Sequence, residues 1–398
     1  MAQTISSFFS GGTSAGGAAV EQIDQMLSEA LVQEVFPGCV LLVGRNGQPL
    51  YYKSCGYRSK PAEDSDLTSA APMTAEMVFD IAAVTEVFIT TTILMQLVSS
   101  GVVSLNDRIY RYIQAFAVSG KETVTIGHVL SQASGLAQYQ SFYEELDHEN
   151  NSRRLGIMGS RSAREYVYNS INRSSIKFAP GSRQLYSDLG YMLLGQLIEM
   201  LTGLSLERAA QKYIFQPLQL QSSGFVNMEV VKRKGLSPNT AIIAPTEDCA
   251  WRKREICGEV HDENAWAMGG VAGHSGMFST AADLHRFASE LIFCWQGKSE
   301  FLDRQVLQTF WSGQGISAEG SWVYGWEHPS RDNRMLESGL SPAAVGQNGL
   351  TGCSLWIDPE KGLDIVLMTN RINLGRNNKK IMAFRAELTR LVLQAFAL

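Results

Sequence analysis

The chain carries strand patterns at both of its ends and helical patterns between them, and this order limits the folds that it can adopt. Near the N-terminus, apolar runs at 39–43 and 50–52 flank Asn46-Gly47, which is the strongest short signal for a β-hairpin. Near the C-terminus, apolar runs at 354–357 and 363–368 form a second such pair. The sequence therefore predicts one antiparallel sheet to which both chain ends contribute strands.

Helical patterns fill the middle of the chain and lie beside the terminal strands. Apolar residues almost encircle the segments 81–100 and 191–202, as is typical of buried helices. Further helices are predicted at 20–36, 283–293 and 378–396. The predicted fold class is therefore α+β: an antiparallel β-sheet flanked by N- and C-terminal helices, with an inserted, mainly helical region.

We expect three parts along the chain. Residues 1–17 are rich in Ser, Gly and Thr and are predicted to form a flexible tail. Residues 18–79 and 300–398 are predicted to form an α/β sheet subdomain, and residues 80–299 a mainly helical subdomain. A chain of 398 residues is long enough to bury a large core.

Composition argues against several classes of partner. A net charge of −5 without a basic cluster argues against a nucleic-acid partner. No apolar run reaches the roughly 18 residues that span a bilayer, and the N-terminus lacks the basic and apolar regions of a secretory signal. We therefore expect a cytoplasmic protein without a membrane or nucleic-acid partner, and the sequence leaves the oligomeric state open.

Cysteine and histidine spacings do not indicate a metal or a cofactor. No C-x-x-C and no matched Cys/His spacing occurs, so we expect free thiols, no metal and no cofactor. A disulfide between Cys249 and Cys257 stays open as an alternative. The run Gly269–Gly273 is not followed by Lys-Ser/Thr, so it indicates a tight turn rather than a phosphate loop.

Four segments carry an ordered set of motifs: Phe79–Phe88, Tyr186–Asp188, Gly258–Thr280 and Gly346–Gly352. They resemble, in turn, the Ser-x-x-Lys segment, the Tyr-x-Asn element, a stretch of the class C-like branch, and the Lys-Thr-Gly or His-Thr-Gly element of the serine β-lactamase, DD-peptidase and family VIII esterase superfamily. Val129–Leu136 also resembles the family's His-Thr-Ser-Gly-Leu. The resemblance covers most of the chain and implies an α+β fold with a cleft between the sheet and the helical region.

The residues that would carry covalent chemistry in this family are replaced. Ala83 stands in the position of the serine nucleophile, and Glu86 stands in the position of the lysine base. A methyl group cannot attack a carbonyl carbon, and removing the nucleophile of a comparable serine hydrolase lowers turnover by about 10⁶-fold. The sequence therefore predicts the family's fold without its acyl-enzyme route.

Glu86 and Tyr186 each allow two interpretations. Glu86 is either a surface or paired carboxylate of a helix, or a cleft carboxylate whose pKa is raised by partial desolvation and which activates water. The resemblance implies that Tyr186 moves protons to the leaving group. Because that role needs a neighbouring cation and Glu86 replaces it, Tyr186 is also interpreted as a hydrogen-bonding wall of the cleft.

The third motif and Asp188 are predicted to bind a ligand. Gln347, Asn348 and Gly349 stand on the strand that the family uses to hold a substrate carboxylate or carbonyl. Gln and Asn donate hydrogen bonds but carry no charge, so affinity for anionic β-lactams should fall more than affinity for neutral amides or esters. The alternative is that these are polar edge-strand residues without a ligand.

The leading functional hypothesis is a pseudoenzyme that keeps a cleft for a small-molecule or peptide-like ligand. One alternative is a hydrolase in which Glu86, assisted by Tyr186, directs water onto an ester, amide or cell-wall-type substrate. Another is a substituted version of an active serine hydrolase, and a third is a scaffold that uses only its outer surface. The fold by itself does not decide among these functions.

Overall fold

The computed structural model describes residues 17–60, 71–153, 156–312 and 320–397, and almost all of the predicted tail 1–17 lies outside them. A seven-stranded antiparallel sheet runs in the order β2-β1-β12-β11-β10-β9-β8. These strands are β1 Gly38–Arg45, β2 Gln48–Gly56, β8 Trp322–Val323, β9 Trp326–Glu327, β10 Val345–Asn348, β11 Ser354–Asp358 and β12 Leu363–Thr369. The predicted α+β class and the two strand pairs are confirmed.

The two ends of the chain meet inside this sheet. β1 pairs with β2 across the predicted hairpin, and on its other side it pairs antiparallel with β12. The hairpin closes at Asn46 and Gly47, which have φ angles of 47° and 78°. Two successive positive φ angles match the twist of a tight hairpin, and this explains why the Asn-Gly pair marks the turn.

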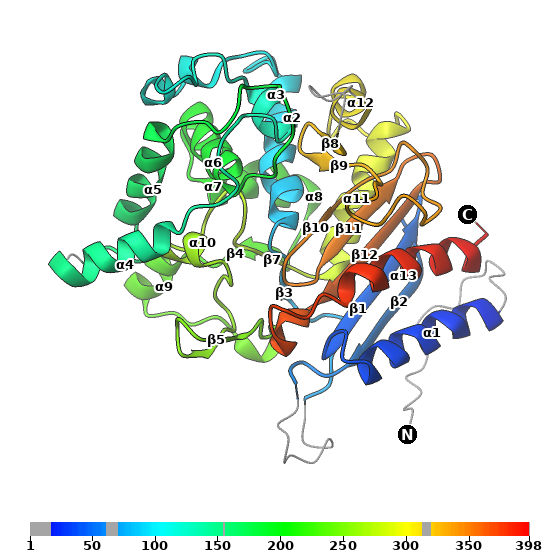
Figure 1. The fold of residues 1–398 in the computed structure, drawn as a ribbon. Coiled ribbons are helices and arrows are strands. Elements are labelled where there is room, and N and C mark those ends of the chain that lie inside the picture. The colour runs from blue at the N-terminus through cyan, green and yellow to red at the C-terminus, as the bar shows by residue number, and fades with distance from the viewer. Residues whose placement is uncertain (1–16, 61–70, 154–155, 313–319, 398) are drawn as a thin grey trace.

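Helices cover both faces of the sheet (Figure 1). α1 (Gly17–Val32) and α13 (Ile381–Ala395) lie together on one face and bury an apolar cluster that includes Leu41 and Ile365. α11 (Ala281–Trp295) packs on the other face, against β1 and β12. The larger apolar core extends from that second face into the helical region.

The inserted region is built around two buried helices. The first comprises the π-helical segment Glu86–Thr91 and α2 (Thr92–Ser99), and the second is α6 (Asp188–Thr202), which ends at Gly203 with a φ of 67°. The other helices are α3 Ile126–Leu130, α4 Phe142–Arg153, α5 Arg161–Arg173, α7 Leu206–Ala210, α8 Gln216–Leu218, α9 Met228–Lys234, α10 Glu263–Ala267 and α12 Arg304–Ser312. The short strands are β3 Phe79–Asp80, β4 Gly224–Phe225, β5 Asp248–Cys249, β6 Arg254–Glu255 and β7 Met277–Ser279. The residue limits expected for the two subdomains stay predictions.

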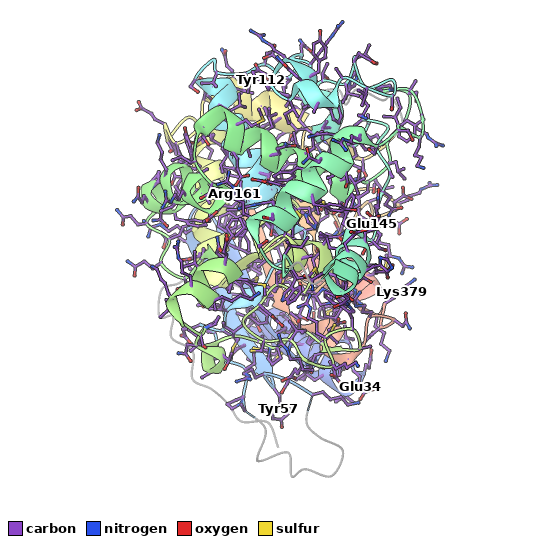
Figure 2. All side chains as sticks on the ribbon, turned by 90° about the vertical axis from the view of Figure 1, so that its left-hand side faces the viewer. Glu34, Tyr57, Tyr112, Glu145, Arg161 and Lys379 are labelled. Atoms are coloured by element: carbon purple, nitrogen blue, oxygen red, sulfur yellow. The ribbon has the colours of Figure 1, made fainter. Side chains whose placement is uncertain are left out.

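Two residues that are far apart in sequence lie on the same side of the molecule. Figure 2 shows Glu145 of α4 and Lys379, which precedes α13, on the same side of the view. The helical region and the C-terminal segment thus both border this side. The cavity described below lies between residues of these two parts.

Within the ranges given above, no single helix has the length and apolar character needed to cross a membrane. α6 and the helical segment Leu206–Leu218 satisfy that test only as a pair bent by 71°. α6 is mostly buried in the protein core. All six cysteines are free, and Cys39 and Cys55 face each other across β1 and β2 with their sulfur atoms 3.3 Å apart.

Candidate functional site

The turn that precedes the first buried helix is strained. Ala82 has a φ of 47°, a left-handed conformation that a residue with a Cβ rarely adopts. Buried Asp80 holds the turn, because its Oδ1 accepts a hydrogen bond from the Ala82 amide at 2.9 Å and its Oδ2 accepts one from the His261 amide at 2.7 Å. Strained backbone of this kind is concentrated at functional sites. The turn places Ala83 at the entry of the helix, where the sequence motif predicted the nucleophile position.

Glycine at position 349 lets a strand end approach this turn. A Cβ on Gly349 would lie 2.6 Å from the Ile81 carbonyl oxygen, closer than such atoms approach in proteins. The Thr351 hydroxyl also donates to the Asp80 carbonyl at 2.8 Å. The end of β10 is therefore fastened beside Ala83, as the order of motifs predicted.

Glu86 is completely buried, and both of its carboxyl oxygens are hydrogen-bonded. The Tyr186 hydroxyl donates to Oε1 at 2.6 Å, and Nε2 of Gln347 donates to Oε2 at 2.7 Å. Burial raises the pKa of Glu86 well above its ordinary value, although these hydrogen bonds act in the opposite direction. Glu86 is thus a buried carboxyl with both oxygens paired, and it favours the neutral form.

Tyr186 and Asp188 border the cavity in front of Glu86. Burial, together with the neighbouring Glu86 and Asp188, raises the pKa of Tyr186 well above that of a free phenol. Burial also raises the pKa of Asp188 to about 6, against the opposing effect of nearby His274. At neutral pH the Tyr186 phenol therefore keeps its proton while Asp188 is mostly ionised.

The cavity has a volume of about 400 Å³ and lies between the helical region and the segment that joins β12 to α13. Of the predicted site residues, Ala83, Tyr186, Asp188, Asn348 and Gly349 line it. The remaining lining residues are Ala82, His261, Asp262, His274, Ser275, Leu350, Arg371, Lys379, Ile381, Met382 and Arg385.

Gln347 differs from its predicted role as a ligand-binding residue. Its side chain is buried and donates to Glu86 behind the cavity wall. Its other amide atom, Oε1, accepts a hydrogen bond from the Asn348 backbone at 3.1 Å. Gln347 uses both ends of its amide inside the protein, whereas the neighbouring Asn348 borders the cavity.

Asp262 and His274 also line the cavity, although the sequence did not identify them as site residues. Nε2 of His274 lies 2.9 Å from Oδ1 of Asp262. Burial opposes ionisation of both groups, but their mutual attraction lowers the pKa of Asp262 to about 2 and raises the pKa of His274. The contact therefore favours the ionic form of the pair. Both residues lie in the Gly-rich stretch that resembles the class C-like branch, but no spacing rule showed that they meet.

Two cations on the opposite wall, Arg371 and Arg385, hold the protein backbone. Nη2 of Arg385 donates to the carbonyl groups of Gly349 and Cys353 at 3.1 and 2.9 Å. Nε of Arg371 donates to the Leu350 carbonyl at 3.0 Å. These arginines stabilise the turn after β10. They do not replace the missing lysine beside Ala83, because Glu86 occupies that position.

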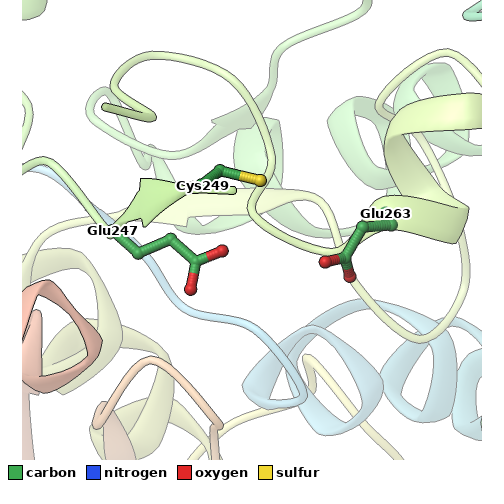
Figure 3. A group of neighbouring side chains, drawn as sticks. All are labelled: Glu247, Cys249 and Glu263. Carbon is green, nitrogen blue, oxygen red and sulfur yellow. The ribbon is translucent and has the colours of Figure 1, made fainter. Parts of the chain in front are cut away.

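A second cluster of side chains, Glu247, Cys249 and Glu263, brings possible metal ligands together (Figure 3). Their ligand atoms lie within 4.8 Å of one another. Arg376 occupies this cluster, because its Nη2 donates to Glu247 at 2.7 Å and also to Glu263. An arginine of the same chain thus balances the two carboxylates, and the sequence prediction of no metal is not tested by this arrangement.

Comparison with known proteins identifies a matching family and a similar curated protein. The family model described as beta-lactamase matches residues 23–388. An N-acetylmuramyl-L-alanine amidase of Bacillus subtilis (strain 168) is 28% identical over 371 residues, which are 88% of this chain and 81% of that protein.

Two solved structures share the fold. The octameric penicillin-binding protein homologue from Pyrococcus abyssi has a TM-score of 0.65 at 21% identity, over 88% of this chain and 73% of that one. EstCE1, described as a hydrolase with promiscuous acyltransferase activity, has a TM-score of 0.67 at 19% identity, over 94% of this chain and 99% of that one. At these identities the likeness concerns the fold alone.

Proposed function

The chain belongs to the beta-lactamase family, as the resemblance predicted, and we propose that it is a pseudoenzyme with respect to serine chemistry that binds a small-molecule or peptide-like ligand without a covalent bond. One observation carries this proposal. The carboxyl at the lysine position, Glu86, has both oxygens hydrogen-bonded, to Tyr186 and Gln347. Position 83 offers no hydroxyl, and the group behind it favours the protonated form.

The residues around the cavity support a neutral amide or ester ligand. Asn348 and Tyr186 offer uncharged hydrogen-bonding groups, while Ile381 and Met382 add apolar surface. The two positions that would supply a cation next to Ala83 hold Glu86 and Gln347 instead. The name of the amidase relative fits a ligand that contains an amide group.

Intact-protein mass spectrometry with a penicillin and with a phosphonate probe tests the loss of covalent chemistry. We expect no stable adduct on the unaltered chain, and an adduct mapped to a cavity residue would overturn the proposal. Thermal unfolding against a panel of short peptide amides and esters tests binding, because a ligand that binds only the folded state raises Tm. If no panel member shifts Tm or survives native mass spectrometry, the ligand-binding part of the proposal fails.

Membership of a hydrolase family also fits the alternative prediction of direct attack by water. Glu86 is poorly placed to serve as its base, since it lies behind the cavity wall with both oxygens occupied. A side chain that takes a proton from the attacking water would have to border the cavity itself. Asp188, Asp262 and His274 are among the ionisable side chains of the helical wall that meet this condition, beside Tyr186 and His261.

A further inference from the structure

His274 has a buried ring nitrogen without a partner. Its Nε2 contacts Asp262, whereas its Nδ1 makes no hydrogen bond within the described ranges, although only 2% of the residue is exposed. A buried polar atom that is left unpaired is costly, and a native protein usually uses it. Because His274 borders the cavity, a bound ligand is a suitable partner for this nitrogen.

Asp262 orients the imidazole. It is the N-cap of α10, and its Oδ1 also accepts a hydrogen bond from the Ala265 amide at 2.7 Å. A carboxylate that holds one ring nitrogen of a histidine fixes the ring and stabilises its protonated form. His274 then presents an Nδ1–H donor on the other side of the ring.

Asp188 supplies the complementary group. It is the first residue of α6 and borders the same cavity. The ionisable groups that act on it are Tyr186, Glu86, Asp262 and His274. The cations of the opposite wall are Arg371, Lys379 and Arg385. A carboxylate and an imidazolium on one wall form a base and an acid for a carbonyl group held between them.

We propose that Asp188 and His274 form an acid–base pair that hydrolyses a neutral ester or amide in the cavity by direct attack of water. This inference deepens the proposed function and rests on it, because the step begins from a ligand bound without a covalent bond. The water oxygen bonds to the carbonyl carbon while Asp188 takes a proton from that water. His274 gives its Nδ1 proton to the leaving oxygen or nitrogen as the carbon–heteroatom bond breaks.

The products are a carboxylic acid and an alcohol or amine, and no co-reactant is needed. Solvent carries the proton from Asp188 back to His274, which restores both groups. Asp262 is a positioning residue, since it acts on the reaction only through the imidazole.

Hydrolysis of p-nitrophenyl butyrate and butyryl p-nitroanilide by the full chain tests the proposal. Asp188→Asn and His274→Gln should each lower kcat by about 10²- to 10⁴-fold, the usual contribution of a general acid or base. His285→Gln is a matched control. Its Nδ1 lies 2.7 Å from Asp364 in a similarly buried His–Asp pair, but neither residue borders the cavity. That variant should keep kcat within about twofold of the unaltered chain.

A pH profile of the unaltered chain gives a test that does not depend on variants. Activity should fall as the pH drops through about 6, where Asp188 takes up a proton, and Asp188→Asn should remove that limb. A flat profile between pH 5 and 7 would overturn the inference, as would equal losses in the His285 and His274 variants. Ligand binding without turnover would also overturn it but leave the proposed function standing, whereas a covalent adduct would remove the proposed function.

Discussion

Glu86 and Gln347 are 261 residues apart in the sequence, yet Nε2 of Gln347 donates to Oε2 of Glu86 at 2.7 Å inside the protein. Each residue departs from the family motif that it occupies. Glu86, in the lysine position, accepts a hydrogen bond from the Gln347 amide of the third motif. Each replacement therefore supplies a hydrogen-bonding partner for the other. This complementarity fits a site whose charge pattern changed as a unit better than it fits a single inactivating substitution.

The Glu86–Gln347 contact should show energetic coupling. Gln347→Leu removes a donor and leaves Oε2 of Glu86 buried without a partner, so we expect a loss of about 1–3 kcal/mol of stability. Adding Glu86→Leu to that variant removes the stranded oxygen and should cost less than the sum of the two single changes. Urea unfolding of the two single variants and the double variant measures the coupling, and strictly additive values would contradict it.

Glu86 should also give the protein a characteristic pH dependence. Its folded-state pKa lies above its ordinary value of 4.5, so the folded state binds the proton more tightly than the unfolded state. The stabilisation is complete below pH 4.5 and declines as the pH rises through the folded-state pKa. Glu86→Gln should abolish this decline. Unfolding free energies of both proteins between pH 4 and 9 provide the measurement, and parallel curves would count against a raised pKa.

Restoring the two motif residues tests whether the rest of the cleft still supports acylation. Ala83→Ser alone should give no penicillin adduct, because Glu86 cannot take the serine proton in its favoured neutral form. Ala83→Ser with Glu86→Lys should give an adduct on the introduced hydroxyl that intact-mass analysis detects and peptide mapping locates. If the double variant folds but forms no adduct, the cleft has diverged beyond these two positions.

The strained turn at Ala82 gives a prediction about stability. Glycine adopts a φ of 47° without the steric cost that alanine bears, so Ala82→Gly should be neutral or stabilising by up to about 1 kcal/mol. Ala383→Gly, at an exposed position of α13, is the control and should destabilise by about 1 kcal/mol. Equal losses in the two variants would show that the turn at Ala82 carries no strain.

Local signals explain which elements could be predicted from the sequence. The Asn46-Gly47 hairpin and the end of α6 at Gly203 each depend on residues whose backbone preferences are strong. The first buried helix was predicted from Ile81, but its helical residues begin at Val84. Residues 81–83 form the tight turn around Ala82 instead, with a hydrogen bond from Val84 N to the Ile81 carbonyl. Apolar periodicity does not reveal such a turn.

The site was harder to predict because its contacts join distant parts of the chain. Motif order indicated that Ala83, Tyr186 and Asn348 face one cleft, and the structure brings them to one cavity. The motif order did not indicate that the Gln347 side chain points inward to Glu86, because this orientation depends on a hydrogen-bonding partner in another motif. Asp262 and His274 were missed for a different reason. Their pairing depends on how the Gly-rich turn folds, and no spacing rule describes that turn.

The pairing of β1 with β12 has a consequence for how the chain is made. The partner of the first strand begins at Leu363, so a ribosome needs on the order of tens of seconds to supply it after the first hairpin emerges. During that interval one edge of the nascent hairpin exposes free amide and carbonyl groups. Newly synthesised chains should therefore depend on chaperones more than a protein of this size whose sheet strands follow one another.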